Sequence, residues 1–257
     1  MNLFYKDYAP EHTQPLLILH GLLGAGGNWH SLSRNVFSKH YRVLAVDLRN
    51  HGKSPHSDTF DFPSMVEDVR ELMDTMGFER AHILGHSMGG KVAMWFGLMY
   101  PERVDKLIVA DIAPRAYPPH HLPIFEGLRA LDLPSFQSRG EIDAALATHV
   151  AEAPVRQFLL KNLASDGAGS YSWKMNLETI YENYPLINKA VVTDRTFNKP
   201  TLFIRGGRSS YIRKEDEPAI LTLFPDTEFI TIPNAGHWVH AEAPQPFANS
   251  VLEFLGT

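Results

Sequence analysis

The protein has 257 residues, of which 44% are hydrophobic, 21% are charged and none is cysteine. This composition is typical of a globular protein; it excludes a disordered, collagenous or coiled-coil chain, a disulfide scaffold, a thiol nucleophile and a cysteine zinc site. The formal net charge is −5 and there are no long basic runs, so nucleic acid and anionic membranes are poor partners.

The N-terminal segment, residues 1–10, lacks the apolar centre of a signal peptide. No apolar run in the sequence approaches the ~20 residues that are needed to span a bilayer. We therefore expect a cytoplasmic protein without membrane insertion.

Short apolar runs rich in branched residues recur along the chain with little polar alternation, which is typical of parallel strands covered on both faces. These runs span residues 15–19, 42–47, 81–85, 106–111, 200–205 and 228–232. Helical patterns lie between them, at residues 64–76, 88–100 and 247–255. Ser64 and Glu67 have the spacing of a capping box at the start of the first of these helices. The alternation predicts an α/β fold with a doubly wound, mostly parallel sheet.

A long segment, residues 112–199, interrupts this alternation, because it is rich in proline and contains no convincing core strand. It is too long for a structureless loop in a compact domain. Helical patterns around residues 140–150 and 153–163 predict a helical cap inserted after the strand that ends at Asp111. We assign residues 1–113 and 196–257 to the core and residues 114–195 to the cap. Most cap aromatics are expected to pack the cap onto the core, and a few to line an apolar substrate pocket.

The strongest chemical signal is the segment Gly85-His86-Ser87-Met88-Gly89, which has the pattern G-x-S-x-G between an expected strand and an expected helix. A sharp turn there presents the Ser87 hydroxyl at the carboxyl edge of the sheet and at a helix N-terminus. The two glycines allow close backbone approach, since a β-carbon would clash. Ser87 is the candidate nucleophile.

A serine hydroxyl needs a neighbouring base to take its proton. His237 follows the last expected strand, so it lies at the same edge of the sheet as Ser87. His20 ends a strand but belongs to a different turn, His86 neighbours Ser87 and points elsewhere, and His240 has the position of an ordinary loop residue. His237 is therefore the candidate general base.

The third group of such a site is a carboxylate that orients the histidine. Asp111 ends the strand after the Ser87 helix, which places it at the same edge. The loop after the next strand has no carboxylate before Glu215 and Asp216, although Ser209 or Ser210 could hydrogen-bond the acid. Asp111 is the preferred acid, and Asp216 is its main rival.

An oxyanion hole requires two converging backbone N–H groups. One belongs to Met88, which follows the nucleophile, and the other to the glycine-rich loop at residues 20–27, where Leu22 is preferred and Leu23 is second. This loop meets neither the P-loop nor the dinucleotide pattern, so we expect no cofactor. Adjacent His120 and His121 project differently and no metal motif occurs, so we expect no metal.

These segments resemble the α/β-hydrolase superfamily. The resemblance rests on residues 20–22, 47–54, 85–90 and 235–238, and it covers the whole chain except the cap, of which only the position matches. More narrowly, residues 86–91, 111–114 and 235–240 resemble the bacterial YbfF-type carboxylesterases. Many α/β-hydrolases carry the acid after the penultimate strand; the departure from that pattern at residues 206–210 fits the YbfF-like branch and favours Asp111.

The resemblance implies hydrolysis of small-molecule carboxylic esters or acyl thioesters without a cofactor. Serine at position 87 argues against dehalogenases and epoxide hydrolases, which use a carboxylate nucleophile. Acyl transfer, perhydrolysis and carbon–carbon bond hydrolysis remain alternatives on the same residues, because the fold does not select among them. A ligand-binding receptor with negligible turnover is a further alternative, and the sequence leaves the oligomeric state open.

Overall fold

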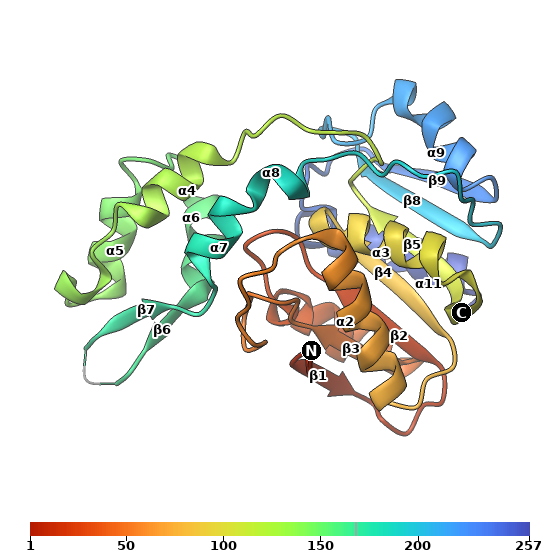
Figure 1. Ribbon diagram of the computed structural model, residues 1–257, viewed down its shortest axis with the longest axis horizontal. Helices are drawn as coiled ribbons and strands as arrows, with labels where there is room; N and C mark the ends of the chain where they lie inside the picture. Colours follow the sequence, from red (N-terminus) through yellow and green to blue (C-terminus); the bar gives the residue numbers. More distant parts are fainter. Residues whose placement is uncertain (168) are drawn as a thin grey trace.

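A computed structural model describes residues 1–167 and 169–257 (Figure 1). The main sheet has seven strands in the order β1-β3-β2-β4-β5-β8-β9, and β6 and β7 form a separate antiparallel pair. All neighbours in the main sheet are parallel except β1, which runs antiparallel to β3. The strands are β1 Tyr5–Tyr8, β2 Pro15–Leu19, β3 Arg42–Val46, β4 Ala81–His86, β5 Val104–Ala110, β6 Leu163–Ser165, β7 Tyr171–Trp173, β8 Thr201–Gly206 and β9 Thr227–Ile232.

Helices cover both faces of this sheet, because consecutive residues of a strand point to opposite faces. In β2, Leu17 and Leu19 join the apolar cluster that includes α2, α3 and α9, whereas Leu16 and Ile18 join the cluster that includes α1 and α11. Figure 1 shows α2 and α3 on one face and α11 behind the other. The α-helices are α1 His30–Asn35, α2 Phe62–Thr75, α3 Met88–Met99, α4 Leu122–Arg129, α5 Arg139–Leu146, α6 Ala153–Leu159, α7 Leu177–Glu182, α8 Tyr184–Ile187, α9 Glu217–Leu223, α10 Val239–Glu242 and α11 Pro244–Leu255.

The start of α2 differs from the sequence-based expectation. The side chain of Asp61 accepts the Ser64 N–H at 2.8 Å, so Asp61 is the N-cap and Ser64 lies within the first turn. Pro63 occupies the second helical position, where its missing N–H costs no hydrogen bond. The capping box that was expected at Ser64 is therefore wrong, and the helix begins two residues earlier.

The segment between β5 and β8 holds α4 to α8 and the short β6–β7 hairpin, which the sequence did not indicate. Figure 1 shows α4 to α7 and this hairpin as a lobe beside the core, joined to it by long extended connections. Among the aromatics here, Phe125 and Tyr184 are buried in the apolar cluster, and Phe158 lines a cavity. The exact division between core and cap, at 113/114 and 195/196, stays a prediction.

Within the described ranges, no helix is both long enough and apolar enough to cross a membrane.

Candidate active site

Ser87 lies at the junction of β4 and α3, in a backbone conformation that is rare for a residue with a side chain. Its φ is 54° and its ψ is −120°. This strained turn is typical of a nucleophile elbow, which exposes the hydroxyl at the edge of the sheet. The turn depends on two close backbone approaches. A β-carbon on Gly85 would lie 2.2 Å from the Gly89 carbonyl oxygen, and one on Gly89 would lie 2.4 Å from the Leu19 carbonyl oxygen.

We expect the substitution Gly85→Ala to lower the free energy of unfolding by about 1–3 kcal/mol, because the added methyl group meets backbone that cannot move aside. Activity should fall with it, since the Ser87 turn must shift. The matched control is Gly27→Ala, where an added β-carbon meets nothing within 4 Å. Thermal unfolding and ester turnover of both variants check this result; equal stability of the two variants would contradict it.

His237 lies in the loop after β9 and connects the other two candidate residues. Its Nε2 is 3.0 Å from the Ser87 Oγ, and its Nδ1 is 2.8 Å from Asp111 Oδ2. The three side chains come from the carboxyl ends of β4, β5 and β9, which the parallel sheet brings to one edge. The structure thus places Ser87, His237 and Asp111 in one continuous hydrogen-bonded chain.

Asp111 is fully buried and accepts two further hydrogen bonds. The Gly206 N–H donates to Oδ1 at 2.9 Å, and the Ser209 hydroxyl donates to Oδ2. Burial raises the pKa of Asp111 to about 6, although these two hydrogen bonds act in the opposite direction. Burial lowers the pKa of His237. At neutral pH the carboxylate is therefore ionised and the imidazole neutral, which is the state in which Nε2 can accept a proton.

The rival acid, Asp216, lies elsewhere. Its carboxylate pairs with Arg115, with an N–O distance of 3.2 Å, and accepts the Arg213 N–H at 2.8 Å. The structure gives the position beside His237 Nδ1 to Asp111.

The glycine-rich loop after β2 provides one candidate for the oxyanion hole. The Leu23 N–H donates to His51 Nε2 at 3.2 Å, and the Gly24 N–H donates to the Gly21 carbonyl at 3.0 Å. Leu23 is thereby engaged within the protein, which favours Leu22 among the two candidates of this loop. Met88 is the first residue of α3 and carries one of the N–H groups that a helix leaves without an internal partner.

Two other residues fix the position of His237, and neither role was predicted from the sequence. His86 Nε2 lies within hydrogen-bond distance of the His237 carbonyl oxygen, at 2.9 Å. This contact holds the backbone of the loop that carries His237. The Tyr211 ring stacks on the His237 ring, with a centroid distance of 3.8 Å and an interplanar angle of 17°. Both contacts join segments that are distant in sequence, so no local sequence pattern predicts them.

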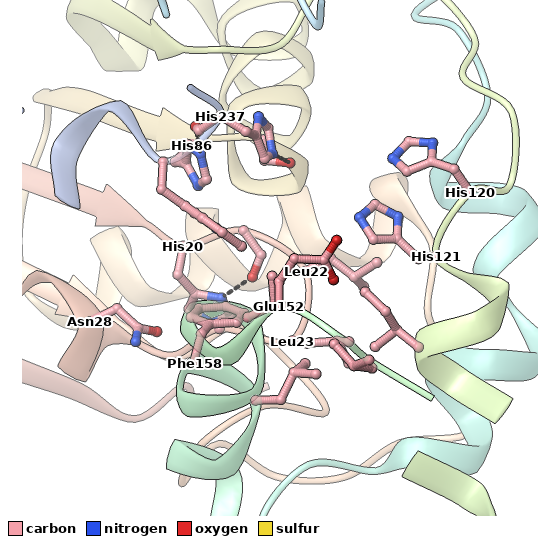
Figure 2. Close-up of a pocket in the computed structure, with 18 of the residues that line it drawn as sticks. His20, Leu22, Leu23, Asn28, His86, His120, His121, Glu152, Phe158 and His237 are labelled. Atoms are coloured by element: carbon pink, nitrogen blue, oxygen red, sulfur yellow. Dashed lines mark hydrogen bonds between the residues drawn. The ribbon is translucent and has the colours of Figure 1, made fainter. Parts of the chain in front are cut away.

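A cavity of about 430 Å³ opens at Ser87, between the core and the cap. In Figure 2, His237, His86 and Leu22 surround it from the core, and Phe158, Glu152 and the pair His120 and His121 approach it from the cap. Most of the remaining wall is apolar, including Ile124, Val150, Val155, Leu159 and Trp238. This size and lining are typical of a site for a small organic molecule. Among the described residues, no group of three His, Asp or Glu side chains could hold a metal ion.

The sequence model of the alpha/beta hydrolase fold matches residues 14–244, which include every residue of this site. The chain belongs to the α/β-hydrolase family. It is 39% identical over 263 residues to the sn-1-specific diacylglycerol lipase ABHD11 of Mus musculus, a match that covers 99% of this chain and 85% of that protein. It is 34% identical over 249 residues to Esterase YbfF of Escherichia coli, with 95% of this chain and 94% of that protein covered.

Among solved structures, this α/β-hydrolase is similar to a marine microorganism esterase, with a TM-score of 0.95, 40% sequence identity and 99% of both chains covered. The predicted fold and the resemblance to YbfF-type esterases are confirmed by these matches.

Proposed function

We propose that Ser87, His237 and Asp111 hydrolyse carboxylic esters through an acyl-enzyme intermediate. The protein is a carboxylesterase-type hydrolase, as its similarity to named esterases and a lipase over almost the whole chain supports. The observation that carries the catalytic assignment is the chain of hydrogen bonds from Asp111 through His237 to Ser87, at the wall of the large cavity.

In the first half of the reaction, His237 Nε2 takes the proton of the Ser87 hydroxyl as Oγ attacks the ester carbonyl carbon. The negative oxygen that forms is held by the backbone N–H groups of Leu22 and Met88. His237 then gives its proton to the departing alcohol, and the acyl group remains on Ser87.

In the second half, His237 takes a proton from water, and the resulting hydroxide attacks the acyl group. The tetrahedral intermediate collapses, the carboxylic acid leaves, and Ser87 recovers its proton from His237. Asp111 holds the Nδ1–H tautomer of His237 throughout and stabilises the imidazolium that forms in each half.

The test is hydrolysis of a series of p-nitrophenyl esters from acetate to palmitate. We expect turnover within this series, because the apolar cavity beside Ser87 is large enough to hold one arm of the ester. The release of p-nitrophenol measures the rate, and the chain-length profile measures how much of the acyl arm the protein accommodates. A folded protein that hydrolyses none of these esters would contradict ester hydrolysis and favour thioesters, carbon–carbon bonds or a binding role.

A further inference from the structure

A second, smaller cavity of about 30 Å³ also begins at Ser87. It is lined by the first turn of α3, including Met88 and Lys91, and by Tyr117 and Asn188 from the segment that leads into and out of the cap. Ser87 and Leu22 line both cavities. An ester has two arms, one on each side of the reacting carbonyl carbon, so the site has one large and one small compartment beside its candidate nucleophile.

Lys91 is the charged group of the small cavity, and its surroundings are unusual for a lysine. Its side chain is only 1% exposed, and its ammonium donates to the Lys189 carbonyl oxygen at 2.5 Å. The ammonium lies 4.9 Å from the centre of the Tyr117 ring and 5.9 Å from that of Phe62. Among the described residues, no carboxylate lies within ion-pair distance of it. Burial, together with the nearby Arg115, lowers its pKa to about 7.

This position is costly for a cation on three counts. Burial removes the hydration of the ammonium, and no opposite charge replaces it. Lys91 also lies in the first turn of α3, where the helix dipole presents its positive end. The hydrogen bond to one carbonyl and the contacts with two aromatic rings offset part of this free-energy cost. A leucine or methionine at position 91 would fill the same space without any cost of burying a charge. A buried cation that lacks a counter-charge inside the protein and lines a cavity beside the nucleophile is suited to receive that charge from a ligand.

We propose that the small cavity is a subsite for the short arm of an ester that ends in a carboxylate, bound by the ammonium of Lys91. The substrate class is then the half-esters of short dicarboxylic acids, with the larger apolar arm in the large cavity. This inference rests on the proposed ester hydrolysis by Ser87. The small volume of this cavity favours a short arm over a long chain, and a planar carboxylate over the bulkier phosphate.

The test compares benzyl hydrogen succinate with benzyl pentanoate, which have acyl arms of similar length that differ in the terminal carboxylate. Released benzyl alcohol gives kcat/KM for each ester. In the wild-type protein we expect the half-ester to be the better substrate. In Lys91→Met, which keeps the volume and removes the charge, the ratio of the two kcat/KM values should fall about tenfold or more, mainly through KM of the half-ester.

Two further variants separate charge from structure. Lys91→Arg keeps a cation and should retain more of the ratio than Lys91→Met. Lys53→Met removes an exposed lysine, which lies over the Phe4 ring and lines neither cavity, and should leave the ratio unchanged. If Lys91 only tethers the cap through the Lys189 carbonyl, Lys91→Met changes both substrates equally and the proposal is overturned.

A measurement on the wild-type protein covers the case in which Lys91→Met does not fold. Free succinate should inhibit hydrolysis of benzyl pentanoate with an inhibition constant about tenfold or more below that of free pentanoate. Equal inhibition by the two acids would overturn the subsite while leaving ester hydrolysis intact. Absence of turnover on both benzyl esters and on the p-nitrophenyl series would instead overturn the proposed function.

Discussion

The substitution Ser87→Ala is expected to lower kcat for ester hydrolysis by about 10⁵-fold or more, because loss of the nucleophile removes the acyl-enzyme route entirely. The residual rate would come from the oxyanion hole and substrate binding alone. The Ser87 Oγ lies 3.0 Å from His237 Nε2, and no other hydroxyl side chain is hydrogen-bonded to that nitrogen among the described residues.

The fold should survive this change. Alanine has the same backbone strain as serine at φ 54°, and the Ser87 backbone N–H still donates to the Ala110 carbonyl. Steady-state kinetics with a p-nitrophenyl ester, together with circular dichroism and thermal unfolding, check the prediction. A well-folded Ser87→Ala variant that retains more than about 1% of the activity would contradict the catalytic role of Ser87.

The second large effect is expected for Asp111→Asn, with a loss in kcat of about 10³- to 10⁴-fold. An asparagine can offer its NH₂ group to Nδ1, which stabilises the wrong tautomer of His237, and it carries no charge to stabilise the imidazolium. Asparagine tolerates the positive φ of 49° at this position, so the backbone is retained.

The matched control for this prediction is Asp216→Asn, which removes the charge of the rival carboxylate. Asp216 pairs with Arg115 and not with His237, so its loss should change kcat by less than about threefold. Kinetics of both variants on one ester decide the assignment. A large loss in Asp216→Asn and a small one in Asp111→Asn would reverse the roles of the two carboxylates.

The strands that carry the site were predictable because each is a short apolar run with little polar alternation. The run at 81–85 and the glycines around Ser87 predicted the β4–α3 turn, and β9 predicted the place of His237. The edge strand β1 was not predicted, since Tyr5–Tyr8 has only four residues, of which only Tyr8 is buried, and is too short to give a clear pattern. The β6–β7 hairpin was not predicted for the same reason, because each of its strands has only three residues.

The candidate triad followed from sequence because Ser87 and Asp111 directly follow strands of a parallel sheet and His237 lies in the loop after the last strand. Chain order therefore places all three at one edge. The contacts that support it did not follow. Tyr211 stacks on His237 only because two loops lie side by side in the folded protein. Lys91 entered the sequence analysis only as the final residue of the segment 86–91. Its lack of a counter-charge depends on which residues of the cap surround it, and such long-range packing leaves no periodic signal.

The role of Ser87 as nucleophile is tested by identifying the residue that becomes covalently modified by a serine-reactive reagent. The protein is treated with a fluorophosphonate, which forms a stable bond to an activated serine and releases fluoride, and the modified peptide is located by mass spectrometry. We expect one adduct per chain, on Ser87, formed in parallel with the loss of esterase activity, and no adduct in Ser87→Ala. Loss of activity with the adduct on another residue, or full labelling of Ser87→Ala, would contradict the role of Ser87 as nucleophile.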